Sequence, residues 1–111
     1  MHIGDLDAAS TPGGTGKWNA TVTITVHDTA HNPVAGVTVT GAWSNGATGT
    51  GSCVTNASGQ CFLSKTGLRT TTNSVTFSVT NATHGSLTYQ PASNHDPDGD
   101  STGTTIIVNK P

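Results

Sequence analysis

A strict alternation of apolar and polar residues extends over positions 18–27. The apolar members occupy every second position, and the residues between them are Asn, Thr and His; the apolar set is Trp18, Ala20, Val22, Ile24 and Val26. A period of two is typical of a β-strand that has one face in a core and the other in water. We therefore expect the clearest strand of the chain here.

Shorter segments of the same kind follow. A second strand is expected over 37–43, a hairpin over 52–65 with its tip at 56–59, and further strands near 75–79, 87–89 and 104–109. Asp, Asn, Gly and Pro, which favour turns, separate these segments. Six or seven short strands without a helical period predict an all-β fold, an immunoglobulin-like antiparallel β-sandwich of about seven strands.

Composition supports this class and limits the partners. The 111 residues suffice for one domain, 1–111, in which 1–17 is a first strand and a flexible lead-in rich in Gly, Ser and Thr. Glutamate is absent and Lys and Arg number only 4, so residues that fill helix surfaces are scarce. With 9% charged residues and a net charge of −2, we expect no nucleic-acid partner. No apolar run is long enough for membrane insertion, and a monomer is expected.

Two cysteines, Cys53 and Cys61, flank the tip of the predicted hairpin. Residues opposite one another on antiparallel strands have Cβ atoms close enough for a disulfide. An even cysteine count in a Thr- and Gly-rich chain favours one intra-hairpin disulfide and a secreted, extracellular location, with free thiols as the alternative. A zinc site on these cysteines is not favoured, because no second cysteine pair accompanies them.

Several strings of residues carry a family resemblance. They are Ile3-Gly4-Asp5-Leu6-Asp7, Trp18 followed by 21–28, the segments 31–35, 41–44 and 74–77, the cysteine hairpin, and the aspartate-rich string 94–101. Together they resemble the immunoglobulin-like domains appended, often at the C-terminus, to large secreted bacterial proteins, including extracellular peptidases. The resemblance covers nearly the whole chain and implies a non-catalytic accessory domain whose partners are the other domains of a parent polypeptide.

The expected function is therefore that of a spacer, a stabilising module or an attachment module, and not that of an enzyme. The chain contains no Gly-x-Ser-x-Gly nucleophile elbow, and a domain of this size uses its apolar residues for a core rather than a cleft. The alternative is a carbohydrate- or polymer-binding module that holds a parent enzyme on an extracellular polymer or a cell surface. That alternative needs exposed rings at Trp18, Trp43 or Tyr89, whereas the alternation places both tryptophans inward.

All six acidic residues are aspartates, and five of them are candidate ligands for calcium. Asp5 and Asp7 stand near the start of the chain, and Asp96, Asp98 and Asp100 alternate before the last expected strand. In an immunoglobulin-like sandwich these two segments lie at the same end, and Ca²⁺ prefers six to eight oxygen ligands. The alternative is that these aspartates are solvated turn formers.

Histidines offer a different metal chemistry at the same end of the predicted sandwich. His27, His31 and His95 fall there, and imidazoles combined with a carboxylate are an acceptable ligand set for zinc or another transition metal. This is the less favoured metal hypothesis, because each of these histidines has an easy carboxylate or backbone partner. His2 and His84 are expected on the surface.

Overall fold

The computed structural model of the chain describes residues 1–97, 99 and 101–111. Within these residues it contains seven strands and one 3-10 helix: β1 (His2–Pro12), β2 (Lys17–His27), β3 (Thr38–Ser44), β4 (Thr50–Val54), β5 (Gln60–Arg69), β6 (Ser74–Thr83), η1 (Pro91–Ser93) and β7 (Thr105–Asn109). The all-β prediction is confirmed. No helix in this part of the chain is long and apolar enough to cross a membrane.

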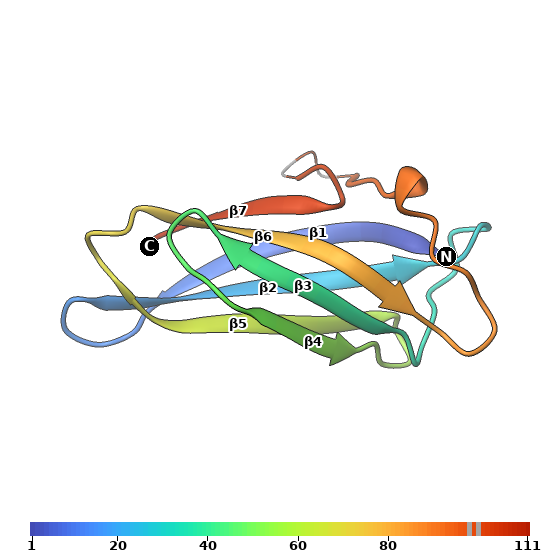
Figure 1. The fold of residues 1–111 in the computed structure, drawn as a ribbon, viewed down its shortest axis with the longest axis horizontal. Coiled ribbons are helices and arrows are strands. Elements are labelled where there is room, and N and C mark those ends of the chain that lie inside the picture. Colours follow the sequence, from blue (N-terminus) through green and yellow to red (C-terminus); the bar gives the residue numbers. More distant parts are fainter. Residues whose placement is uncertain (98, 100) are drawn as a thin grey trace.

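The strands form two antiparallel sheets that pack against each other (Figure 1). One sheet has the order β1-β2-β5 and the other the order β4-β3-β6-β7. The chain passes from one sheet to the other between β2 and β3, between β4 and β5, and between β5 and β6. This arrangement confirms the predicted seven-stranded antiparallel β-sandwich.

The core lies between the sheets and contains the apolar face of β2 that the alternation predicts. Every member of that face is at most 1% exposed, and Val39, Val75, Phe77 and Val108 face it from the other sheet. Trp18 is buried with its ring nitrogen Nε1 donating to the carbonyl oxygens of residues 69 and 72, both at 3.1 Å. Trp43 is also buried and packs on Phe77, with ring centroids 5.1 Å apart.

Two segments differ from the sequence expectations. The glycine- and threonine-rich lead-in is partly strand, because Ser10, Thr11 and Pro12 pair with residues 20, 19 and 18 of β2. The segment 87–89 is not a strand. Instead, residues 88–95 pass over the start of β1, where the amide of Gln90 donates to the carbonyl of Met1 at 2.8 Å. The N-terminus, η1 and the β2–β3 loop therefore gather at one end of the sandwich, and the C-terminus lies at the other (Figure 1).

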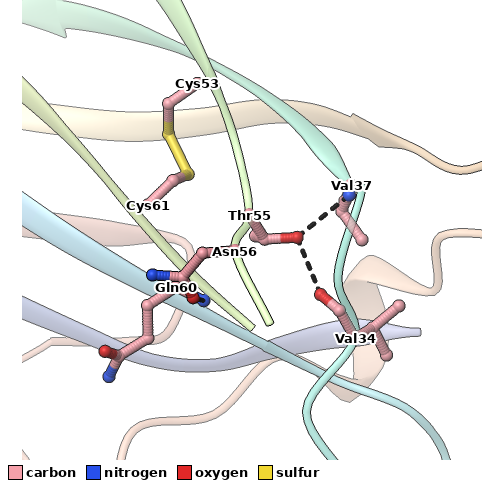
Figure 2. Close-up of a disulfide and its surroundings, with 7 residues drawn as sticks. All are labelled: Val34, Val37, Cys53, Thr55, Asn56, Gln60 and Cys61. Atoms are coloured by element: carbon pink, nitrogen blue, oxygen red, sulfur yellow. Dashed lines mark hydrogen bonds between the residues drawn. A yellow bond between two sulfur atoms is a disulfide. The ribbon is translucent and has the colours of Figure 1, made fainter. Parts of the chain in front are cut away.

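The disulfide between Cys53 and Cys61 is present, with a Cα–Cα distance of 5.8 Å (Figure 2). The strands that carry it are consecutive but belong to different sheets, so it joins the two sheets rather than two paired strands of one hairpin. The reason lies in the pairing, since Cys53 is opposite Val39 on β3 and Cys61 is opposite Ile24 on β2. Both partners are fully buried, and the cysteines therefore point into the space between the sheets.

The turn after β4 is tied to the segment that leads into β3. The buried hydroxyl of Thr55 accepts from the amide of Val37 at 2.9 Å and donates to the carbonyl of Val34 at 2.7 Å (Figure 2). The carboxamide oxygen of Asn56 accepts from the amides of Ser58 and Gln60 and closes the turn. These bonds fix the C-terminal side of the β2–β3 loop, which carries one of the site residues described below.

Gly41 on β3 tests the packing of the buried Phe77 ring, which β6 of the same sheet carries into the core. A Cβ atom at this position would lie 2.2 Å from Cζ of Phe77 and 2.9 Å from the carbonyl oxygen of Ser78. We expect Gly41→Ala to lower the free energy of unfolding by about 2–3 kcal/mol, measured by urea denaturation, because overpacking displaces a buried ring. Gly85→Ala is the matched control, since nothing lies within 4 Å of its Cβ position. Equal midpoints for the two variants would contradict this packing.

Candidate metal centre

Four histidines from four separate segments meet at the end of the sandwich that carries the N-terminus. They are His2, His27, His31 and His95, and one ring nitrogen of each lies within 4.8 Å of the corresponding atoms of the others. His2 is buried, His27 and His95 are partly buried, and His31 is exposed. The cluster therefore sits at the surface end of the core, accessible from one side.

Strand pairing supplies the first two histidines. His2 opens β1 and His27 ends β2, and the two are direct partners in the antiparallel ladder. A bulge in β1 between Ile3 and Asp5 includes Gly4, over which the imidazole of His27 packs. A Cβ atom at Gly4 would lie 2.1 Å from Nδ1 of His27, so only glycine leaves room for this ring position.

His31 is presented by a tight turn in the β2–β3 loop. The carboxylate of Asp28 accepts from the amides of Ala30 at 2.9 Å and Asn32 at 3.0 Å, and the backbone of His31 adopts a φ of 64°. The backbone hydrogen bond from Asn32 holds the pKa of Asp28 below its usual value, although burial opposes this shift. Asp28 thus acts as the anchor of the turn. The left-handed conformation of a non-glycine residue is uncommon and is maintained by these bonds.

His95 is positioned by its own backbone and by the residue before it. The amide of His95 donates to the carbonyl of Ile3 at 3.1 Å, and the carboxamide oxygen of Asn94 accepts from the amide of Ile3 at 2.8 Å. Nδ1 of His95 lies 3.3 Å from the carbonyl oxygen of Ser93. A carbonyl can only accept, so Nδ1 carries the proton in this contact and Nε2 keeps its lone pair. Such a backbone bond is a common way to orient a metal-binding histidine.

Burial and the neighbouring imidazoles favour the neutral forms of His2 and His27. Burial lowers the pKa of His2 and of His27, and the neighbouring histidines of the cluster lower both further. Nε2 of His2 and Nδ1 of His27 are buried and have no hydrogen-bond partner among the residues described. A neutral imidazole offers a lone pair to a metal ion, and a buried polar atom without a partner carries a cost that coordination would relieve.

The geometry suits a nitrogen-preferring metal ion. Ligand nitrogens in a tetrahedral zinc site lie about 3.4 Å apart, which follows from Zn–N distances of about 2.0–2.1 Å. The nitrogens of the four imidazoles lie within 4.8 Å of one another, so they would have to move closer together to reach that geometry. The cluster can therefore bind Zn²⁺ or a similar divalent transition metal ion.

A cavity of about 420 Å³ opens beside the cluster. Two of the histidines, His2 and His31, form part of its wall, and the side chains of Thr29, Gln90 and Ser93 form the rest of the lining that the structure describes. These three residues are exposed, and each carries an uncharged hydrogen-bonding group. The cluster is thus reachable from solvent.

The aspartates proposed for calcium are only partly placed by the structure. The carboxyls of Asp5, Asp7 and Asp96 come together, and Asp96 also accepts from the hydroxyl of Ser101. Burial raises the pKa of Asp5 to about 7, and hydrogen bonds with Asp96 and Asp7 contribute to this rise. Oδ1 of Asp5 is buried without a hydrogen-bond partner in the described part of the chain. Asp98 and Asp100 lie outside the described residues, so the calcium set stays a prediction.

The sequence identified three of the four clustered histidines. His2 was expected on the surface, and that expectation is wrong, because only 3% of its surface is exposed. It lies beside β2, and residues 90–95 bond to the residues on either side of it. His84 is outside the cluster and its Nδ1 accepts from the amide of Ser86. Pairing of His2 with His27 across β1 and β2 would have identified His2 as a member of the cluster. That pairing depends on the bulge in β1, and the alternation of apolar and polar residues does not reveal a bulge.

Comparisons with protein-family models, with curated proteins and with solved structures found no match to this chain.

The raised pKa of Asp5 predicts a pH dependence of stability. In the unfolded chain Asp5 has a pKa of 3.8, and in the folded protein about 7, so between these values only the folded state holds the proton. The contribution of Asp5 to stability is therefore fully present below about pH 4 and is lost as the pH rises toward 7. His2 and His27, whose pKa values are lowered, give the opposite slope near pH 6, so the wild-type profile alone is ambiguous.

Asp5→Asn separates the two effects, because it removes one carboxyl and leaves the histidines in place. We expect the variant to gain stability relative to the wild type between pH 5 and pH 8, by about 1–2 kcal/mol, because a half-buried carboxyl is partly screened by solvent. Urea unfolding in excess chelator at both pH values measures this difference. A difference that does not change with pH would contradict the raised pKa.

Proposed function

We propose that this chain is a non-catalytic β-sandwich module that binds a divalent transition metal ion through His2, His27, His31 and His95. One observation carries the proposal: four imidazole nitrogens from four separate segments lie within 4.8 Å of one another. Imidazole nitrogen is a preferred ligand of Zn²⁺, Cu²⁺ and Ni²⁺, and a poor one for Ca²⁺.

The bound metal ion would cross-link the end of the sandwich. Its four ligands belong to the first residue of β1, the last residue of β2, the β2–β3 loop and the segment between η1 and β7. The last two segments contain few core residues, and hydrogen bonds that Asp28 and Asn94 accept from backbone amides hold them in place. Metal binding to the folded state alone stabilises that state by mass action, so the module would gain stability in a metal-containing environment.

We further propose that the module serves as a spacer, a stabilising domain or an attachment domain within a larger secreted bacterial protein. This rests on the resemblance described above and is supported by the disulfide between the sheets, since disulfides persist in oxidising compartments. The polymer-binding alternative needs exposed aromatic rings, and the described structure does not support it. Trp18 and Trp43 are buried, and the half-buried Tyr89 uses its hydroxyl as an acceptor for Asn94.

Thermal melting tests the metal site. With free Zn²⁺ at about 100 times its Kd, binding stabilises the folded state by about 2.7 kcal/mol, which raises Tm by roughly 10 °C in a domain of this size. His31→Gln is the informative variant because its side chain is exposed and its loss leaves the core intact. We expect it to lose more than half of the shift, while His84→Gln keeps all of it.

The same melting curves distinguish the two metal hypotheses. Coincident curves in Zn²⁺ and in excess chelator would overturn the histidine site. A rise in Tm with Ca²⁺ that His31→Gln leaves intact would instead support the predicted calcium site, whose ligands are Asp5, Asp7, Asp96, Asp98 and Asp100. The histidine site predicts that Ca²⁺ has no such effect.

Gly4 provides an independent test of His27 as a ligand. A methyl group at position 4 would occupy the space of the His27 ring and displace it from the cluster. We expect Gly4→Ala to weaken Zn²⁺ binding about tenfold or more, as loss of a supporting contact around a metal site does. Isothermal titration calorimetry measures the affinity, and Gly85→Ala is the control. An unchanged affinity in a folded Gly4→Ala protein would remove His27 from the ligand set.

A further inference from the structure

The four histidines are not arranged equally. The ring centroids of His2, His31 and His95 form a nearly equilateral triangle with sides of 5.2, 5.1 and 5.3 Å. The ring of His27 lies farther from each of them, at 6.0, 6.0 and 6.4 Å. This is a pyramid with a three-histidine base and a more distant fourth ring. A square arrangement would give two long and four short distances, which these values do not show.

The cavity adjoins the base of this pyramid. Its wall includes two members of the triangle, His2 and His31, whereas His27 is not among the lining residues that the structure describes. A metal ion held by the triangle would therefore have His27 on one side and the cavity on another. Zinc sites with three histidines keep a position for an outside ligand, and zinc can expand to five ligands.

Resting on the metal site proposed above, we propose that the metal ion has a coordination position open to this cavity and binds a small carboxylate there. The volume of about 420 Å³ falls within the range of small-molecule sites. Apart from the two histidines, the described lining carries no ionisable side chain, so the metal ion is the group that balances the negative charge of the ligand.

The remaining lining groups indicate how the carboxylate is held. The hydroxyls of Thr29 and Ser93 and the carboxamide of Gln90 can all donate hydrogen bonds. A carboxylate presents two oxygens, of which one coordinates the metal ion and the other accepts from such donors. A ligand of the size of acetate or a short hydroxy acid fits this combination.

The test uses the full chain loaded with Co²⁺, whose visible absorption reports the number and type of its ligands. Azide and acetate are titrated separately into the Co²⁺ protein. We expect saturable changes of the visible bands with both anions, because each enters the open position. We expect Thr29→Val to weaken acetate binding about 3- to 10-fold, the effect of one lost hydrogen bond. The matched control is Thr70→Val, because the exposed Thr70 lies at the opposite end of β2, where its amide donates to the carbonyl of Gly16, and we expect it to leave acetate binding unchanged.

The outcomes separate this inference from the metal site itself. A Co²⁺ protein whose spectrum stays unchanged with each anion at about 0.1 M, one hundred times a weak Kd of about 1 mM, has a closed site, and the inference is overturned while metal binding stands. Failure to bind Co²⁺ at all overturns both. Acetate binding that Thr29→Val leaves unaffected would contradict the cavity as the place where the ligand is held.

Discussion

In a regular β-strand, residues three positions apart face opposite sides, so Ile3 and Leu6 could not both enter one core. The bulge between Ile3 and Asp5 adds one residue to β1, and both side chains are fully buried. Burial of these two residues therefore fixes the register of β1 against β2. The same register sets His2 opposite His27, so the positions of these two proposed metal ligands follow from the packing of the core. A shift of one residue would move His2 away from the cluster and expose Ile3.

The histidine cluster is costly for the apoprotein. Burial lowers the pKa of His2 and of His27, and each has one buried ring nitrogen without a partner in the described structure. An unsatisfied buried polar group costs about 1–3 kcal/mol, which the core of the sandwich has to offset. Departures of this kind from ordinary packing rules are typical of functional sites. The four converging imidazoles are thus better explained by a ligand than by the needs of the fold.

Much of the fold could be predicted from the sequence because its information is local. Alternation over 18–27 identifies β2 and its buried face, and the cysteine spacing identifies the disulfide. The partners of β4 and β5 could not be predicted, because consecutive strands joined by a short turn pair with each other or separate into two sheets according to distant contacts. The path of the chain after β6 could not be predicted either, because the sequence has no periodicity there. Asn94 and Gln90 hold it to the start of the chain: Asn94 accepts a hydrogen bond from the amide of Ile3, and the amide of Gln90 donates one to the carbonyl of Met1.

The site shows the same division between local and distant information. Residue types suggested metal chemistry at one end of the sandwich, and three of the four histidines were placed there. Aspartates were favoured over histidines because each histidine was expected to have a carboxylate or backbone partner. In the folded chain the aspartates and the histidines differ in how many hydrogen-bond partners each set finds among its own members. Burial raises the pKa of Asp5, and the carboxyls of Asp96 and Asp7 are hydrogen-bond partners for the proton that Asp5 then holds. The histidines have no comparable hydrogen bonds within the described protein, because Nε2 of His2 and Nδ1 of His27 remain without partners. A ring nitrogen with a free lone pair is a ligand that transition metal ions prefer, and the proposed metal ion would give both of these nitrogens the partner that the described protein groups do not supply.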